Sequence, residues 1–362
     1  MFEVKEEREK ALIISLVRKS KEKKAKIEEL RELEALTKAA GAIPLEKIIQ
    51  VREKPDPATY IGKGKALFLK EIDVDVLVFN EPLTPAQISN LEELTDKKVL
   101  DRQDIILDIF AQHARTKTAK IEVELAQLKF RLSRLTGRGV ELSRLGGGIG
   151  TRGPGEKKLE VDRRKIYKRI DHLEKELKKI EKMRNVQRNN RREIFTVALL
   201  GYTNAGKTTL FNAITKSFAP VGDQPFVTLD PLTRSVSYPD GDKFLLVDTV
   251  GFIKGIPSEI MAAFKSTLEE AKIADLRLIV VDASSDKLKE ELEETKKVME
   301  FLGIDDSNNI LVFNKIDLVV DPAILSVIQK EFPEALFISA KEKEGLRELM
   351  ERIDDYKKHI RN

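Results

Sequence analysis

A glycine-rich loop that ends in lysine and threonine follows a buried-strand pattern in the second half of the chain. Residues 201–208 read Gly-Tyr-Thr-Asn-Ala-Gly-Lys-Thr, and the preceding run 194–200 is mostly apolar and rich in β-branched residues. Glycines let the backbone curl so that successive N–H groups point at phosphate oxygens, and a helix beginning at Lys207 adds its positive end. The lysine ammonium reaches the β- and γ-phosphates, and the Thr208 hydroxyl is a ligand for Mg²⁺. We therefore predict a nucleoside triphosphate site formed by Gly201, Tyr202, Thr203, Asn204, Ala205, Gly206, Lys207, Thr208 and Thr209.

A second motif predicts which base is bound. Asn314-Lys315-Ile316-Asp317 follows the apolar run 310–313, at the carboxyl end of an expected strand, where α/β sheets bind ligands. The Asp317 carboxylate can accept hydrogen bonds from N1–H and the exocyclic amino group of guanine, whereas adenine lacks this donor pair. Ser339-Ala340-Lys341, after the expected strand 335–338, is placed to support the same base through a backbone N–H. We therefore predict guanine.

Two further segments complete a nucleotide switch. Asp248-Thr249-Val250-Gly251 ends the expected strand 244–247, so that Asp248 can hold Mg²⁺ through water and the Gly251 N–H can sense the γ-phosphate. Residues 226–231 supply Thr228 as a second Mg²⁺ ligand; Thr233 is the alternative, and Thr228 is favoured because a similar Pro-Phe-x-Thr-Leu-x-Pro stretch forms the first switch of Obg-like GTPases. The predicted catalytic residues are Lys207, Thr228 and Gly251, and the predicted switch contacts are Phe226, Val227, Thr228, Leu229, Asp230, Asp248, Thr249, Val250 and Gly251.

Two residues beside these motifs bear on the rate of GTP hydrolysis. Many GTPases carry a glutamine after the second-switch glycine to orient the attacking water, whereas this chain has Phe252, whose side chain neither donates nor accepts a hydrogen bond. We expect slow hydrolysis by the protein alone, on the order of 10⁻⁴ to 10⁻² s⁻¹, with acceleration by a partner or a cation. Asn204 resembles the asparagine that positions K⁺ in some translation and tRNA-modification GTPases; the alternative is a hydrogen bond that stabilises the loop.

Length and composition favour a multidomain protein outside the secretory pathway. A chain of 362 residues has room for two or three domains. No run of 18 or more apolar residues is present, and the first residues do not resemble a signal peptide. Cysteine is absent, which excludes a disulfide framework, a thiolate metal site and a cysteine nucleophile. We expect a cytoplasmic monomer without stable membrane insertion; peripheral membrane association stays open.

Positive charge is concentrated in the middle of the chain. Residues 131–192 contain 20 Lys and Arg against 8 Asp and Glu, a net charge of +12 in a chain of net charge +4, and 8 of the 19 glycines lie within 137–155. Apolar residues recur every three or four positions on both sides of this glycine segment, at Ile121, Leu125, Leu128, Leu132 and Leu135 and at Ile166, Ile170, Leu173, Leu177, Ile180 and Met183. Such narrow seams predict two helices that pair. We predict an antiparallel hairpin over 116–192 with a glycine-rich tip at 137–155.

Two functions fit the basic tip. Its charges can serve only the solubility of a linker, or they can contact RNA, because glycines permit close backbone approach and arginines pair with phosphates. The lack of interleaved aromatic residues argues against stacking on single strands and favours structured RNA that is recognised through its backbone and shape. We expect no DNA partner. The candidate RNA contacts are Arg138, Arg144, Arg152, Lys157 and Lys158.

Residues 1–115 alternate between strand and helix patterns. Strands are expected at 11–17, 48–51, 74–79 and 98–100, and helices at 21–39, after Gly62, after Thr84-Pro85 and at 105–113. This order predicts a small parallel α/β domain before the hairpin and before an α/β P-loop GTPase domain at 193–362. The loop 56–65 has the composition of a phosphate loop but lacks a preceding buried strand and a following Ser or Thr, so a turn or a basic surface is preferred over a second nucleotide site. We expect His113 to be structural.

These motifs together resemble the HflX family of GTPases. The resemblance is carried by 201–207, by Thr228-Leu-Asp-Pro231 and by Asp248-Thr-Val-Gly-Phe-Ile253 in the GTPase domain, and by 101–115 and 146–156 outside it. It extends over nearly the whole chain, and the segments outside the GTPase domain separate this family from Obg or Era. Thr208 stands where serine is commoner, and Pro225 stands where a bulky apolar residue is expected; its fixed φ could bias the switch toward one conformation.

The resemblance implies a GTPase that associates with the large ribosomal subunit and its rRNA, with roles in splitting or rescuing stalled ribosomes. Two other classes remain open. A GTP-switched module could dock on a protein or a membrane through the hairpin, and it would bind RNA weakly and independently of salt. An enzyme of tRNA modification would need a catalytic constellation outside the GTPase domain, and none is visible in the sequence.

Overall fold

The computed structural model describes residues 8–142, 154–189, 194–219, 222, 225–226, 231–238, 241–256, 261, 265–305 and 307–361. The chain divides into two compact units. One is built on a four-stranded sheet and includes the parts of two long helices that lie within 121–176; the other is built on a six-stranded sheet.

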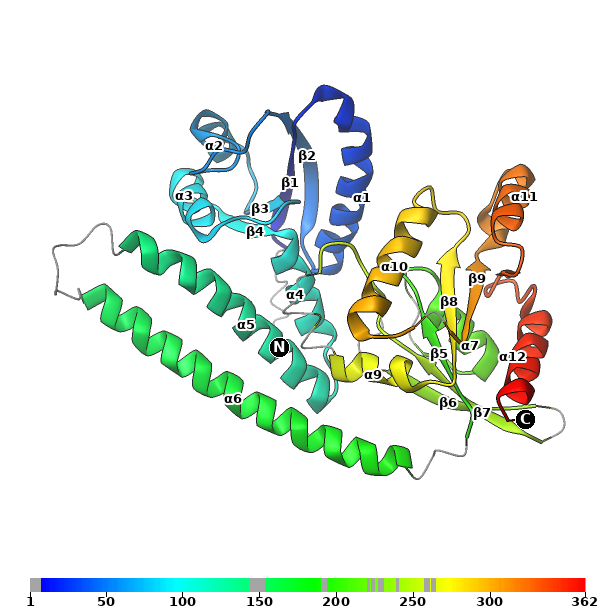
Figure 1. The fold of residues 1–362 in the computed structure, drawn as a ribbon. Coiled ribbons are helices and arrows are strands. Elements are labelled where there is room, and N and C mark those ends of the chain that lie inside the picture. The colour runs from blue at the N-terminus through cyan, green and yellow to red at the C-terminus, as the bar shows by residue number, and fades with distance from the viewer. Residues whose placement is uncertain are drawn as a thin grey trace, which may run out of the picture. The chain divides into compact units, whose positions relative to one another are not determined.

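The first sheet is wholly parallel, in the order β2-β1-β3-β4 (Figure 1). Its elements in chain order are β1 (Lys10–Val17), the 3-10 turn η1 (Ser20–Glu22), α1 (Lys23–Ala39), β2 (Ile43–Val51), α2 (Lys63–Lys70), β3 (Val76–Phe79), α3 (Pro85–Thr95) and β4 (Lys98–Asp101). All residues of β1 after Lys10 are buried, as expected for a parallel strand that is covered on both faces. The predicted parallel α/β domain is thus confirmed.

Local sequence signals account for several of these boundaries. The Thr84 hydroxyl accepts a hydrogen bond from the Gln87 N–H at 3.2 Å, and the Gln87 side chain accepts one from the Thr84 N–H at 3.0 Å. This capping box begins α3 with proline at its first position. In the loop 56–65, the Asp56 carboxylate accepts from the N–H groups of Ala58 and Thr59, which is the geometry of a turn.

The long helices are α5 (Lys117–Leu142) and α6 (Pro154–Asn189), which follow α4 (Arg102–His113). They lie side by side (Figure 1), and Arg169 pairs with Glu124 at 2.6 Å and Lys129 with Glu174 at 2.8 Å. Ile121, Leu125, Ile170, Leu173 and Leu177 of the predicted seams are buried, whereas Met183 is 61% exposed. The antiparallel hairpin is confirmed, but Met183 does not belong to its seam.

The glycine-rich tip is shorter than predicted. Helix α5 continues through Gly137 and Gly139 to Leu142, and α6 already begins at Pro154. The flanking helices therefore include both ends of the segment predicted as a loop. Arg138, Lys157 and Lys158 lie on these helices, while Arg144 and Arg152 lie outside the described residues.

The second sheet has the order β10-β9-β8-β5-β7-β6, and β6 is antiparallel to β7. Its elements are β5 (Thr196–Leu200), α7 (Lys207–Thr215), β6 (Leu232–Ser237), β7 (Lys243–Asp248), α9 (Lys265–Ile273), β8 (Leu276–Asp282), α10 (Leu288–Leu302), β9 (Asn309–Asn314), η2 (Ile316–Leu318), α11 (Pro322–Glu331), β10 (Leu336–Phe337) and α12 (Leu346–Arg361). The parallel strands β5, β7, β8 and β9 end at one edge of the sheet. The predicted P-loop, Asp248 and Asn314 all lie at this edge, where an α/β sheet binds ligands.

Candidate nucleotide site

The loop between β5 and α7 requires its two glycines. Gly201 has φ +145° and Gly206 has φ +88°, conformations that residues with a Cβ rarely adopt. A side chain at Gly201 would overlap the carbonyl oxygen of Val280, and one at Gly206 would overlap the Asn314 amide. Helix α7 begins at Lys207 with Gly206 as its N-cap, as predicted, so that the helix N-terminus faces the loop.

Lys207 lies at the inner wall of this loop. Its side chain is buried, and Nζ donates to the carbonyl oxygens of Gly201 at 3.0 Å and Tyr202 at 2.7 Å. Its pKa is lowered to about 8, mainly by burial and to a smaller extent by Lys315, while Asp248 opposes the shift. A buried ammonium held by two carbonyl groups is ready to bind an anion, since phosphate oxygens would compensate its lost hydration.

Thr208 and Asp248 meet across the carboxyl edge of the sheet. The Thr208 hydroxyl donates to Asp248 Oδ2 at 2.7 Å, and Asp248 is fully buried as the last residue of β7. The Thr249 hydroxyl donates to the Leu199 carbonyl at 2.6 Å and fixes the chain beyond Asp248. Hydroxyl and carboxylate oxygens are the ligands that Mg²⁺ prefers, so these residues fit a Mg²⁺ ion.

The first-switch residues are described only in part. Phe226 is buried with φ +62°, and Val227, Thr228, Leu229 and Asp230 lie outside the described residues. The alternative ligand Thr233 lies on β6, opposite Val247 of β7. The assignment of Thr228 therefore stays a prediction.

The Asn314 side chain connects the end of β9 with the P-loop and with the Ser339–Lys341 segment. Its Nδ2 donates to the Ala205 carbonyl at 2.9 Å, and its Oδ1 accepts from the Ala340 N–H at 2.9 Å. The Ser339 hydroxyl donates to Asp317 Oδ1 at 2.6 Å and so orients the carboxylate predicted to recognise guanine. Of the predicted backbone donors, Ala340 donates to Asn314 and Ser339 to the Glu344 carbonyl; both N–H groups are thus bonded within the protein.

One residue of the site was missed by the sequence reasoning. Asp282, the last residue of β8, pairs with Lys315 at 2.8 Å between Oδ2 and Nζ. Lys315 has φ +62°, and its side chain lies beside Gly206. The available signal was the position of Asp282 at the carboxyl end of an apolar strand pattern, the same signal that identified Asp248 and Asn314.

Three further residues of the predicted site lie at its margin or on the first turn of α7. Asn204 is exposed with φ +61°, Thr209 lies in the first turn of α7, and Lys341 is exposed. Among the described residues, no cluster of three or more His, Asp or Glu side chains forms a metal site elsewhere.

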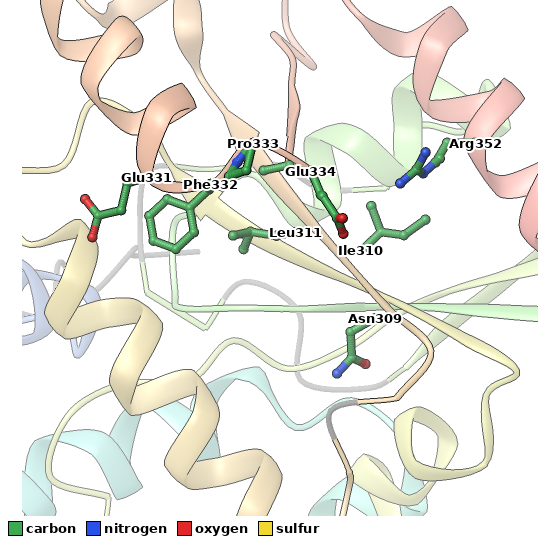
Figure 2. A pocket seen from close by; sticks show the side chains of 9 residues that line it. Asn309, Ile310, Leu311, Glu331, Phe332, Pro333, Glu334 and Arg352 are labelled. Carbon is green, nitrogen blue, oxygen red and sulfur yellow. The ribbon is translucent and has the colours of Figure 1, made fainter.

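Figure 2 shows a pocket that does not belong to this site. It lies at the Asn309 end of β9, opposite the end that carries Asn314. Its walls come from β9, the end of α11, the following loop and α12; they consist of Asn309, Ile310, Leu311, Glu331, Phe332, Pro333, Glu334, Ala335 and Arg352. Since a strand of six residues is roughly 17 Å long, the pocket is remote from the phosphate loop.

Three family models match the chain in succession. Residues 27–111 match a model described as GTP-binding GTPase N-terminal, residues 113–191 one described as GTP-binding GTPase Middle Region, and residues 196–315 one described as 50S ribosome-binding GTPase.

Whole-chain comparisons agree with these matches. The GTPase HflX of Caldanaerobacter subterraneus subsp. tengcongensis is 45% identical over 360 residues, which cover 98% of this chain and 82% of that protein. The GTPase HflX of Escherichia coli K12 is 41% identical over 337 residues, covering 91% and 79%. Among solved structures, the crystal structure of SsGBP in complex with GDP matches with a TM-score of 0.53 and 27% identity, covering 98% of this chain and 99% of that one.

Proposed function

This chain belongs to the HflX family of GTPases, and we propose that it hydrolyses GTP slowly with Mg²⁺ and associates with the large ribosomal subunit. GTP binding and GTP hydrolysis follow from the family and from the GTPase domain. The rate, the metal and the ribosomal partner are the parts that we propose.

The chemistry assigned to the site uses few protein groups. Lys207 and the loop N–H groups stabilise the charge that develops on the phosphates, as electrostatic catalysis requires. Thr208, Asp248 and Thr228 would hold Mg²⁺, which neutralises phosphate charge when it is bound. Water attacks the γ-phosphate without a side-chain base.

Slow hydrolysis is supported by the environment of Phe252. Its side chain is 1% exposed, so it is packed into the protein at the position where many GTPases carry a water-orienting glutamine. No hydrogen-bonding side chain therefore stands at this position of the switch, and a partner must supply the missing group or orient the water.

Association with the large subunit is supported by the basic hairpin. Residues 131–192 carry a net charge of +12, and the paired helices α5 and α6 make up most of this segment. The family model over the GTPase domain carries the description of a 50S ribosome-binding GTPase. Arg138, Arg144, Arg152, Lys157 and Lys158 are the proposed RNA contacts. Docking on a protein or a membrane is the alternative; within the described ranges, no helix is both long enough and apolar enough to cross a bilayer.

The experiment that tests the partner is GTP turnover with and without purified large ribosomal subunits in potassium buffer, with small subunits as the control. We expect a rise of about tenfold or more with large subunits alone, a lower limit set well below the acceleration that a partner-supplied group can give. An unchanged rate with intact GTP binding would contradict the ribosomal role and favour docking on a protein.

The hairpin is tested with two matched variants. Arg138, Lys157 and Lys158 are replaced by glutamine in one, and the exposed Lys178, Lys179 and Lys182 of α6 in the other, so that both lose three positive charges. If the first set contacts phosphates, its slope of log affinity against log salt flattens by up to about 2–3, because each phosphate contact contributes about 0.7–0.9. Equal slopes in the two variants would refute the assignment of the tip.

A further inference from the structure

The segment that follows Asp248 is bound to the P-loop by three hydrogen bonds. The Phe252 N–H donates to the Gly201 carbonyl at 3.1 Å, and the Thr203 N–H donates to the Phe252 carbonyl at 2.7 Å. The Lys254 N–H donates to the Tyr202 hydroxyl at 2.8 Å. The first two continue the parallel pairing of β5 with β7 beyond the ends of both strands. The third is made by a side chain of the loop itself.

These bonds hold Gly251 against the phosphate-binding lysine. A Cβ at Gly251 would lie 2.9 Å from Thr203 Cα and 3.0 Å from Lys207 Nζ, so the backbone at this position lies directly beside the ammonium group. The buried ring of Phe252 anchors the next residue. Gly251 is therefore fixed from one side by a buried side chain and from the other by the P-loop.

We infer that Tyr202 is a positioning residue for the γ-phosphate of GTP: its hydroxyl holds the Lys254 N–H, and thereby keeps Gly251 beside Lys207. The inference rests on the proposed function in one respect, the contact of the Gly251 N–H with the γ-phosphate. It assigns Tyr202 a role in the switch, because its side-chain hydroxyl is bonded to the switch segment.

The hydrogen bond of the Tyr202 hydroxyl should therefore favour binding of GTP and have no effect on binding of GDP. The γ-phosphate is the group that both Lys207 and the Gly251 N–H can bind, whereas GDP contacts the P-loop and needs no second-switch residue. Loss of the hydroxyl removes one of the three hydrogen bonds. The position of Gly251 beside Lys207, which binding of the γ-phosphate requires, is then less stable by the free energy of that bond. The cost falls on GTP and leaves GDP unaffected.

The test is Tyr202→Phe, which removes the hydroxyl and keeps the ring. Tyr356→Phe is the matched control, because the Tyr356 hydroxyl donates to Asn308 Oδ1 at 2.6 Å elsewhere in the same unit. Affinities for GDP and for a non-hydrolysable GTP analogue are measured by titration, together with GTP turnover. For Tyr202→Phe we expect the analogue to bind about two- to tenfold more weakly, the range of one net hydrogen bond, with lower turnover and GDP affinity unchanged.

Three results would overturn the inference. They are an equal loss of GDP and analogue affinity, which indicates a purely structural role; turnover of Tyr202→Phe at or above the wild-type rate; and the same selective loss in Tyr356→Phe. A wild-type protein that fails to respond to large ribosomal subunits would instead contradict the proposed function. The comparison of GDP with the analogue would still decide the role of Tyr202.

Discussion

Replacing Asn314 with alanine removes the only side chain described here that bonds both the P-loop and the Ser339–Lys341 segment. Its two partners, the Ala205 carbonyl and the Ala340 N–H, belong to residues that are 1% and 3% exposed. A buried polar group left without its partner costs about 1–3 kcal/mol, so the bound arrangement of the loop becomes less favourable by about 2–6 kcal/mol. At the lower limit the apparent affinity for GDP falls about thirtyfold, because only the competent fraction of molecules binds.

Titration with fluorescent GDP measures this loss. Asn309→Ala is the control, since Asn309 begins the same strand and also makes two hydrogen bonds, with Arg277 and with the Asp305 carbonyl. Both variants should lower stability, but only Asn314→Ala should weaken nucleotide binding. GDP affinity of Asn314→Ala within threefold of wild type, or an equal loss in Asn309→Ala, would refute the bridging role.

Three other outcomes are expected at the same site. Asp317→Asn should weaken GDP binding and strengthen binding of xanthosine diphosphate in competition assays, because xanthine presents a carbonyl oxygen where guanine has its amino group; unchanged preference would exclude Asp317 from base recognition. Burial lowers the pKa of Lys207 from 10.5 to about 8, so the phosphate-binding ammonium is lost as the pH rises above 8; GDP affinity should fall there by up to about tenfold per pH unit, and a flat profile to pH 10 would contradict this assignment. Exchange of K⁺ for Na⁺ should slow GTP turnover if Asn204 positions a potassium ion, and equal rates would leave Asn204 with the loop-stabilising role.

The placement of the candidate site residues at one edge of the sheet could be predicted from the sequence, because phosphate and guanine chemistry requires particular residue types at fixed spacing. Lys207, Thr208, Asp248 and Asn314 each follow a strand pattern, and the structure places all four at one edge of the sheet. The ion pair of Asp282 with Lys315 could not be derived in the same way. It depends on strand order, because β8 and β9 are neighbours in the sheet and their last residues lie opposite each other.

The predicted bounds of two elements were wrong. Strand β2 begins at Ile43 rather than at 48. Its first half contains Pro44 and the charged pair Glu46 and Lys47, which weaken a strand pattern in the sequence, and its register with β1 shifts there. The hairpin loop was overestimated for a different reason. Glycine in a helix costs about 1 kcal/mol relative to alanine, an amount that a continuing helix tolerates, and α5 passes through two glycines.

Strand β2 also bears on whether a further strand can add to the first sheet. It is one of the two outer strands of that sheet, and within the described part of the chain it pairs with β1 alone. An unpaired row of N–H and C=O groups invites another strand to add. Pro44 lacks an N–H, the register shifts by one residue between Pro44 and Glu46, and Glu46 and Lys47 place charges on the strand. Proline, a bulge and charge are the features by which natural edge strands avoid aggregation. The sheet thus ends in an edge that resists amyloid-like growth.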